Sequence, residues 1–393
     1  MGMSRWGVAL MLGFLVGEII PTAVWAQAGF YVTPSFSFGE VYDDNIFSAS
    51  SGREQDLISR FSPGIQVGYQ STPLTLSGGY TFDSEVFVVH PELTTAQARQ
   101  RASLDVRYLP ISSLTLSLTN TYIETQTSGD INVQTGIQEG RVRTEQLAFL
   151  PSIAYRFDPL TTATGGYGFT KTEQAGGTTN DAHIVNWALD RRITSLDTGS
   201  LGYIFRSFRF DGDSFTDGDS FAGGETTTSH AFTFGWTRQI TPLTEISLRA
   251  GPRFSEGSVN AEALASLRHR LEHGELSFTY SSSQDSVAGE AGAVNTHSFS
   301  ASLTYRFLQF LEVGAAPAFY RNTRGNAEAK VYQLNLNAAY QINQWLSLKS
   351  SYLFSFQQGL LDSTPAIAQP GNGNILHNIA LLSLVITYPY RVY

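Results

Sequence analysis

The sequence predicts an all-β protein, a transmembrane up-and-down β-barrel of about eighteen antiparallel strands, within a range of about sixteen to twenty. Three observations lead to this prediction. Apolar and polar residues alternate in steps of two along most of the chain, which is the period of a strand with two different faces. The connections between these segments alternate between short and long. After residue 26, no stretch is apolar over the roughly 20 residues that a membrane helix requires.

The first 26 residues have the pattern of a secretory signal peptide. Arg5 precedes an apolar stretch, and Ala26 ends the small-residue cut site "VWA". Glu18 and Pro21 interrupt the apolar stretch, which argues against a retained membrane helix. The sequence therefore predicts a cleaved signal peptide over residues 1–26 and a single barrel domain over residues 27–393, located in the outer membrane of a Gram-negative bacterium.

Composition narrows the function classes. The net charge of −9 argues against nucleic acid as a partner, because binding to phosphates needs a basic surface. The absence of cysteine fits an exported protein that does without disulfides. The sequence contains no phosphate-binding loop, zinc-ligand spacing or cofactor motif, so no cofactor is expected.

The strand periodicity is clearest in "LTLSLTNTY", where Leu114, Leu116 and Leu118 share one face and hydroxyl residues the other. A soluble β-sandwich is the alternative, but some of its strands would be apolar on both faces or be covered by helices, and no convincing amphipathic helix occurs. A barrel with lipid outside and water inside fits better. The same alternation recurs in Phe232, Phe234 and Trp236, in Leu276, Phe278 and Tyr280, in Phe299, Ala301, Leu303, Tyr305 and Phe307, and in Leu334, Leu336, Ala338 and Tyr340.

The connections form two series that alternate strictly along the chain. Short connections lie near Thr72, Pro110, Pro159, Leu196, Pro242, Gly274, Leu308 and Asn343. The second series is mostly longer and polar: Asp43–Glu54, His90–Thr95, Gln126–Gly140, Glu173–Asn180, Asp211–Glu225, Ser255–Ser258, Gln284–Ala293, Arg321–Asn326 and Gln357–Asn374. Short periplasmic turns and longer extracellular loops are typical of outer-membrane barrels, and an even strand number places both termini in the periplasm. Ser255–Ser258 is a weak loop, which leaves the strand number open.

Aromatic residues lie near many of the predicted strand ends. Amphipathic rings prefer the headgroup region of a membrane, so we expect contacts with outer-membrane lipid and lipopolysaccharide. The residues concerned are Tyr69, Tyr80, Tyr108, Tyr155, Phe157, Tyr305, Phe307, Tyr340 and Trp345.

The C-terminal segment has the character of a terminal strand recognised by the barrel-assembly machinery. Its apolar residues alternate, but the terminal Tyr393 is one step out of phase with them. We expect Pro389 to mark a bulge that restores the register. The alternating residues are Leu384, Ile386, Tyr388, Tyr390 and Val392.

The stretch "VYDDNIF" places Tyr42, Asp43, Asp44 and Asn45 where the first strand ends. Asp and Asn favour turns because their side chains hydrogen-bond to the local backbone, so the cluster predicts the start of a loop. The stretch does not match an EF-hand calcium loop, because that loop needs carboxylates at alternating positions followed by glycine.

The chain combines a signal peptide, an early strand, the stretch "YDDN" followed by the apolar pair Ile46 and Phe47, and a meander of long strands. In these features it resembles the putative beta-barrel porin 2 family of Gram-negative outer membranes. The resemblance in strand layout covers nearly the whole chain after residue 26. It implies an outer-membrane barrel and a connection with exopolysaccharide production and export.

The polar faces of several strands carry arginine rows with carboxylates among them, and a charge on the lipid face would cost about 2–4 kcal/mol at mid-depth. These rows are therefore predicted to line the lumen. They could be structural ladders, or they could also select anionic or sugar solutes. The rows are Arg99, Arg101, Asp105 and Arg107, then Glu245, Arg249 and Arg253, and then Glu262, Arg268 and Arg270.

Two other chemistries are weaker alternatives. The loop "DGDSFTDGDSF" offers Asp211, Asp213, Asp217 and Asp219 as weak calcium ligands, but neither an EF-hand nor a nonapeptide repeat is present, so a solvated loop is favoured. Acyl transfer would need an Asn, His and Ser set on one face, and in "NTHSFS" Ser298 points away from Asn295 and His297. The protein is therefore not expected to be an enzyme.

The predicted function is a porin-like channel for a polar solute or a polysaccharide chain. Its long loops Gln126–Gly140, Asp211–Glu225 and Gln357–Asn374 are expected to restrict access to the lumen. A small-solute uptake porin and a plugged structural or adhesive barrel are the alternatives.

Overall fold

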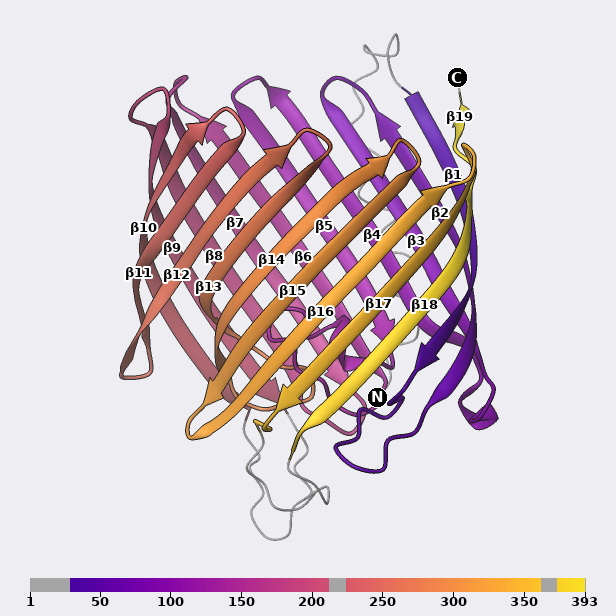
Figure 1. Cartoon of the computed structure of the whole chain (residues 1–393). Coiled ribbons are helices and arrows are strands. Elements are labelled where there is room, and N and C mark those ends of the chain that lie inside the picture. Colours follow the sequence, from indigo (N-terminus) through magenta and orange to yellow (C-terminus); the bar gives the residue numbers. More distant parts are fainter. Residues whose placement is uncertain (1–28, 212–223, 362–372, 393) are drawn as a thin grey trace, which may run out of the picture.

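A computed structural model describes residues 29–211, 224–361 and 373–392. In these residues the chain forms a closed barrel in which each of eighteen strands lies antiparallel to its neighbours and β1 pairs with β18 (Figure 1). The predicted fold class and strand number are therefore confirmed. The predicted signal peptide, Tyr393 and most of the loops Asp211–Glu225 and Gln357–Asn374 lie outside the described residues.

The strands are long, and most have 12 to 17 residues. Since about 9–11 residues are enough to cross a membrane, most strands extend beyond it. Their bounds are β1 Gly29–Asp43, β2 Asp56–Gln70, β3 Leu74–Phe87, β4 Thr95–Ile111, β5 Leu114–Thr125, β6 Thr144–Arg156, β7 Thr161–Gln174, β8 Thr179–Arg192, β9 Asp197–Asp211, β10 Glu225–Thr241, β11 Thr244–Ser255, β12 Ser258–Leu271, β13 Gly274–Asp285, β14 Val294–Leu308, β15 Leu311–Arg324, β16 Ala327–Gln341, β17 Leu346–Gln358, β18 Ile375–Thr387 and the short β19 Tyr390–Val392.

Helical structure in the described residues is limited to two short 3₁₀ turns, η2 Pro91–Leu93 and η3 Ser128–Asp130. None of the helices described is long and apolar enough to cross a membrane.

The outer face of the barrel is apolar, as the period-two alternation predicts. In β10, Phe232, Phe234 and Trp236 point outward and are exposed, while Ala231 and Thr233, on the opposite face, are buried. A water-soluble protein rarely exposes so many large apolar side chains together, whereas lipid covers such a surface in a membrane. The alternation thus produces a wall with lipid on one side and a polar lumen on the other.

Five tyrosines about midway along their strands on the outer face share one arrangement. The hydroxyl of each contacts a polar side chain on the next strand: Tyr80 with Gln100, Tyr167 with His183, Tyr203 with His230, Tyr280 with His297 and Tyr352 with Asn378, at 2.7–3.1 Å. Such side chains have an apolar body and a polar tip, which suits the boundary between lipid and water. Three of the seven histidines therefore belong to this belt.

The longer connections gather at one end of the barrel and the short turns at the other (Figure 1). Two predicted loops are nevertheless tight turns. β11 and β12 are joined by Glu256 and Gly257, with φ of 39° and 80°, and β15 and β16 are joined by Gly325 and Asn326. In the β11–β12 turn both central residues have positive φ, which is the signature of a hairpin turn whose twist matches its strands, whereas in the β15–β16 turn only Gly325 does, with φ of 56°. The sorting of connections by length is thus incomplete, although the seven described connections that were expected on this side lie there.

The prediction of a bulge at Pro389 is wrong. Ser35 pairs with Thr387 in β18, and Val32 pairs with Tyr390 in β19, so β19 keeps the register of β18 along β1. Pro389 has no backbone N–H to donate, so the ladder is interrupted there without a register shift.

The Asp43–Asn45 cluster joins the first and last strands at the loop end. Asp44 accepts hydrogen bonds from the backbone and side-chain N–H groups of Asn378 in β18, both at 2.7 Å. Asn45, which is 0% exposed, donates through its amide to the carbonyls of Ala49 and Leu376, both at 2.9 Å. The cluster begins a loop, as predicted. It also links β1 to β18 across the seam, the place where the first and last strands pair and close the barrel.

Replacing Asn45 with Ala should lower the free energy of unfolding by about 2–3 kcal/mol, because buried backbone groups on both sides of the seam lose their partner. The measurement is urea-induced unfolding in lipid vesicles, followed by tryptophan fluorescence. Asn326→Ala, in an exposed turn away from the seam, is the control. Equal stability of the two variants would contradict the assigned role of Asn45.

Candidate functional site

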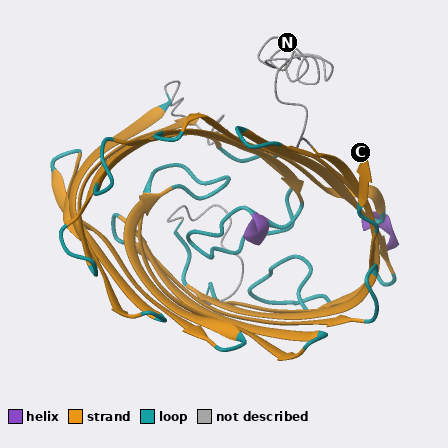
Figure 2. Ribbon diagram, turned by 90° about the horizontal axis from the view of Figure 1, so that it is seen from above, coloured by secondary structure: helices purple, strands orange, loops and turns teal. Residues whose placement is uncertain are grey.

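The connection between β5 and β6, residues 126–143, folds into the barrel and crosses the lumen (Figure 2). Strands β15 to β18 lie opposite β5 and β6 around the ring, and all four contact this loop. The side chains of Asn322 and Gln333 donate to the carbonyls of Thr135 and Gly136, at 2.8 and 3.2 Å. Gln357 accepts from the backbone N–H of Gln138 at 2.8 Å. We call residues 126–143 the crossing loop.

Local hydrogen bonds shape the crossing loop at its base. Thr125 donates through its hydroxyl to Asp130 at 2.8 Å, which closes the η3 turn. Ser128 accepts from the backbone N–H of Glu139 at 2.8 Å and so joins the outgoing limb of the loop to the returning one. At its far end Gly136 has φ of 67°, and a Cβ there would lie 2.6 Å from the ring of Tyr320. Only glycine allows this close approach.

A second connection, residues 286–293 between β13 and β14, also folds inward. Asn180 of β8 donates to the carbonyl of Val287 at 2.6 Å, and Ala293 packs against Phe208 and Phe210 of β9. This segment meets the crossing loop, because the backbone N–H of Ala288 donates to Asn132 at 2.9 Å. We call residues 286–293 the side loop.

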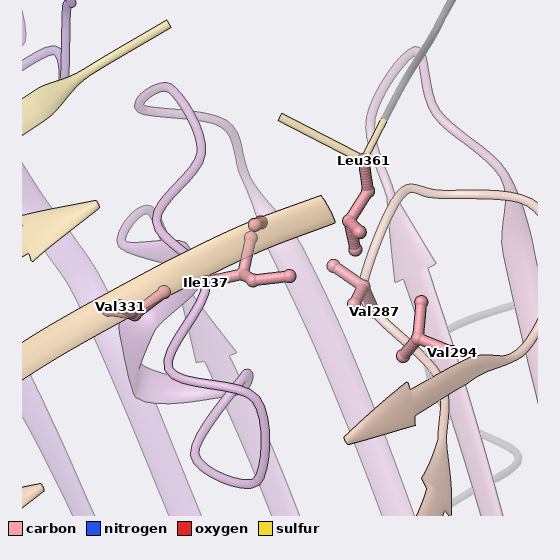
Figure 3. Packing of buried hydrophobic residues seen from close by; sticks show 6 residues of the cluster. Ile137, Val287, Val294, Val331 and Leu361 are labelled. Carbon is pink, nitrogen blue, oxygen red and sulfur yellow. The ribbon is translucent and has the colours of Figure 1, made fainter. Parts of the chain in front are cut away.

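An apolar cluster holds the two loops against the wall. Ile137 of the crossing loop and Val287 of the side loop are buried together with Val294, Ala329, Val331 and Leu361. In Figure 3, Ile137 lies between Val331 on one side and Val287 and Leu361 on the other. Fully burying an aliphatic side chain stabilises by about 1.5–3 kcal/mol, so this cluster favours the inward position of both loops. The loops therefore narrow the lumen at the loop end of the barrel.

Arginines of β4 pin the base of the crossing loop to the wall. Arg99 contacts Asp130 at 3.2 Å and Thr127 at 3.1 Å. Burial acts to raise the pKa of the Asp130 carboxyl, but the charges of Arg99 and Arg101 outweigh burial and hold the pKa below its usual value. Arg101 lies 3.7 Å from Asp130, and its side chain is 46% exposed. Arg99 is thus committed to the loop, whereas Arg101 remains open to the lumen.

Two further carboxylates on the lumen wall each bind two arginines. Glu85 of β3, 2% exposed, contacts Arg60 at 2.8 Å and Arg141 of the crossing loop at 3.3 Å. Across the barrel, Glu262 of β12 contacts Arg206 at 2.6 Å and Arg253 at 3.0 Å. Removing one member of such a buried cluster would leave an uncompensated charge, which costs about 3–5 kcal/mol. These groups are structural.

Charged residues nearer the turn end face the lumen and are exposed to it. On β4, Arg101, Asp105 and Arg107 alternate with partly buried outward residues. On β12, Arg268 and Arg270 are exposed, and Arg268 contacts Glu275 at 3.1 Å. The β11 and β12 rows share one wall, where Glu245 pairs with Arg268 and Arg249 with Leu264 in register, and β4 lies on the other side of the ring.

The lumen rows therefore divide into two groups that the sequence does not separate. Arg99, Arg253 and Glu262 are occupied by buried contacts, whereas Arg101, Arg107, Arg268 and Arg270 are accessible from the lumen. Sequence reasoning did not identify the partners Arg60, Glu85, Asp130, Arg141 and Arg206. Alternation places Glu85 and Arg206 on inward faces, but nothing in the sequence shows which strands pair or that the crossing loop folds inward.

The other candidate chemistries are not assembled in the described residues. Asp211 pairs with Arg209 at 2.9 Å, while Asp213, Asp217 and Asp219 lie outside the described residues. Over the part of the chain that the structure describes, no group of three or more His, Cys, Asp or Glu residues could hold a metal ion. His297 contacts Tyr280, and Ser298 contacts Ser281 at 2.7 Å, so His297 and Ser298 do not form a nucleophile and base pair.

The carboxyl of Glu139 lies where the crossing loop meets the side loop. It accepts a hydrogen bond from Gln174 at 3.2 Å, while Glu290 of the side loop contacts Arg324 at 2.7 Å. Burial, and next the charge of Glu290, raise the pKa of Glu139 to about 8. Glu139 therefore keeps its proton near neutral pH, so that Glu290 is not faced by a second negative charge where the two loops meet.

Replacing Gly136 with Ala should displace the crossing loop from Tyr320 and increase single-channel conductance, because the added Cβ meets the ring at 2.6 Å. The control is Gly176→Ala, since Gly176 also has a positive φ but has nothing within 4 Å of the added Cβ. Both substitutions strain the backbone, and only the first clashes. Equal conductance of the two variants would show that the crossing loop does not limit the pore.

Raising the pH from 6 to 9 should weaken the loop packing at Glu139. An acid whose pKa is raised in the folded state binds more protons than the unfolded chain between the two pKa values, so stability falls as pH rises through that interval. Here the interval runs from the usual 4.5 to about 8. The measurement is the urea midpoint at pH 6 and pH 9. Glu139→Gln should reduce the difference, and an unchanged difference would contradict the assignment to Glu139.

No protein-family model and no curated protein matches the sequence. The chain is similar in structure to OpdQ of Pseudomonas aeruginosa, with 11% identity, a TM-score of 0.44, and coverage of 93% of this chain and 98% of that one. It is similar to OccAB4 of Acinetobacter baumannii, with 9% identity, a TM-score of 0.47, and coverage of 91% and 98%. It is also similar to the FrpB iron transporter of Neisseria meningitidis, with 9% identity, a TM-score of 0.49, and coverage of 92% and 82%.

Proposed function

We propose that the protein is an outer-membrane channel of a Gram-negative bacterium that passes small polar solutes and prefers anions. The observation that carries this proposal is the set of exposed arginines on two walls of the lumen, on the turn side of the constriction. Guanidinium groups bind carboxylates and phosphates through paired N–H donors, and charged rings or rows in a pore set its ion preference. The long loops would face the outside, with both termini in the periplasm.

Arg101 is the residue best placed to set this preference. Its side chain is 46% exposed, and its one ion-pair contact among the described residues, to Asp130, is long at 3.7 Å. Arg99 and Arg253 have shorter contacts and are far less exposed, so their charges hold the wall together instead. A solute that passes the crossing loop would therefore meet Arg101 before Arg107 lower on the same strand.

The constriction favours small solutes over a polymer. Hydrogen bonds from four strands, including that of His377 in β18 to Gln138, and an apolar cluster hold the crossing loop in the lumen, and a polysaccharide chain would have to displace it. Export of exopolysaccharide, which the resemblance in the "YDDN" stretch suggests, therefore requires movement of this loop. A barrel without transport is the remaining alternative.

The surroundings of the channel follow from its outer face. The tyrosine belt would lie at the level of the outer lipid headgroups, in contact with lipopolysaccharide, and the strand ends beyond it would stand outside the membrane. The outward Leu384 and Ile386 of β18 would be available to the barrel-assembly machinery during insertion.

Replacing Arg101 with Gln should lower the anion preference of the channel roughly twofold, because one accessible positive charge leaves the pore wall. The measurement is the reversal potential of purified protein in a planar bilayer under a salt gradient. The control is Arg321→Gln, which removes an equally exposed arginine from the outer face.

Two results would contradict the proposal. If Arg101→Gln and Arg321→Gln leave the reversal potential equally unchanged, the arginine rows do not select ions. If folded, heat-modifiable protein shows no conductance, the barrel is plugged and has a structural role.

A further inference from the structure

Strands β14 to β17 carry two rows of side chains in register toward the loop end of the barrel (Figure 1). The lower row is aromatic and consists of Phe299, Phe319, Tyr332 and Phe356. The upper row lies two residues nearer the loop end on each strand and consists of His297, Arg321, Lys330 and Gln358.

Both rows lie on the outer face of the wall. Val331, between Lys330 and Tyr332, is 0% exposed and belongs to the apolar cluster that holds the crossing loop in the lumen. Asn322, the neighbour of Arg321, donates a hydrogen bond to the same loop. Because neighbours in a strand face opposite sides, Arg321, Lys330 and Tyr332 point away from the lumen. The two rows are therefore separate from the arginine rows of the channel.

The lower row forms a continuous aromatic surface. The ring centroids of Phe319 and Tyr332 lie 4.9 Å apart, and those of Tyr332 and Phe356 lie 6.2 Å apart. Tyr332 and Phe299 are exposed. Rings packed side by side in this way present a broad apolar surface to a ligand.

A hollow of about 480 Å³ lies in the outer wall below the aromatic row. Leu336 of β16 and Tyr352 of β17 line it, each four residues from the row toward the turn end, and Leu382 of β18 also lines it. Glu40 of β1 borders the hollow and accepts a hydrogen bond from Ser59 at 2.9 Å. The hollow extends the apolar surface down to the level of the tyrosine belt, to which Tyr352 belongs.

The upper row has an excess of positive charge. Arg321 contacts Glu328 at 2.6 Å, and Lys330 lies 3.7 Å from the same carboxylate. Two cations thus share one carboxylate, and their side chains are 52% and 39% exposed. An anion that approaches from outside can contact both.

The charge is reversed across the ring. On the outer face of β5 to β7, Glu124, Glu145 and Glu173 stand in register, and Arg143 and Lys171 contact them. Three carboxylates there face two cations, whereas two cations face one carboxylate on β15 and β16. Complementary charge selects the side at which an anion docks. An anionic headgroup is therefore attracted to β15 and β16 and repelled from β5 to β7.

We propose that the outer face of β14 to β17 is a binding site for one phosphorylated glycolipid of the outer leaflet, a lipopolysaccharide molecule. Its phosphate lies on Arg321 and Lys330, because guanidinium and ammonium groups bind phosphate through charge-assisted hydrogen bonds. Its sugar lies against the aromatic row, and an acyl chain runs toward the hollow. A zwitterionic phospholipid carries no net charge and gains less from the two cations. The proposal rests on the outer-membrane location that we propose above, and it does not require conduction.

The test is native mass spectrometry of the protein refolded in detergent micelles, which counts the lipid molecules bound to each barrel. The probes are lipid A with two phosphates and the same lipid A after removal of both phosphates. One phosphorylated molecule should bind per barrel. The dephosphorylated probe should bind about tenfold more weakly, because it has the same sugars and chains but no charge for Arg321 and Lys330.

Three variants locate the site. Arg321→Gln combined with Lys330→Gln should weaken binding of the phosphorylated probe about tenfold. Glu328→Gln should strengthen it about threefold, because the competing carboxylate is neutralised, and a misfolded protein would not produce such a gain. The matched control is Lys171→Gln combined with Arg209→Gln, which removes two other exposed, ion-paired cations and should leave binding unchanged.

The proposal is overturned by any of three outcomes. Folded, heat-modifiable protein that binds no phosphorylated probe has no such site. Equal binding of the two probes means that phosphate is not recognised. Equal binding by the two double variants places the lipid elsewhere. Conductance is measured separately in a planar bilayer, so failure of this site and failure of the channel are distinguishable.

Discussion

The structure depends on one constraint: in lipid, each backbone N–H and C=O group must find a partner within the protein. A sheet meets this constraint only when its first and last strands pair, since an open edge would expose unpaired groups to hydrocarbon. Here β1 pairs with both β18 and β19, and Asp44 and Asn45 add side-chain bonds where the pairing ends. The crossing loop is coupled to this seam, because His377 of β18 lies 2.7 Å from Asp43 and 3.0 Å from Gln138.

The lumen separates structural charges from accessible ones by burial. Glu85 and Glu262 each hold two arginines where loops and long strand ends cover them, and removing either carboxylate would leave the N–H groups of two arginines without their partner. Nearer the turn end, none of the described loops covers the wall, and the arginines there keep their charge toward water. Residues of one type on one strand, such as Arg99 and Arg101, thus have different roles because their depth in the barrel differs.

Period-two alternation was enough to predict the strands and their inward and outward faces, because each of these depends on neighbours in sequence. The prediction of a closed barrel also needed the alternation of short and long connections along the chain. The site depends on contacts between distant residues, which alternation does not encode. Polarity in Gln126–Gly140 marks a loop whether it extends outward or crosses the lumen. Likewise, Asp43 to Asn45 marks a turn, but its partners Leu376 and Asn378 lie more than 330 positions away. At Pro389 the local sequence predicted a bulge, but the pairing of β1 with β18 and β19 on both sides of this residue keeps one register.

The position of the crossing loop also fixes an order of assembly. The loop belongs to the β5–β6 hairpin, but its binding surface comes from β15 to β18, and its cluster partner Leu361 follows β17. Contacts at such separation form late, since the chain between them must be placed first. The pore is therefore wide while its wall is being built and acquires its narrow mouth only when the last hairpins have arrived. The closure of the barrel and the narrowing of its lumen are then completed in the same final step.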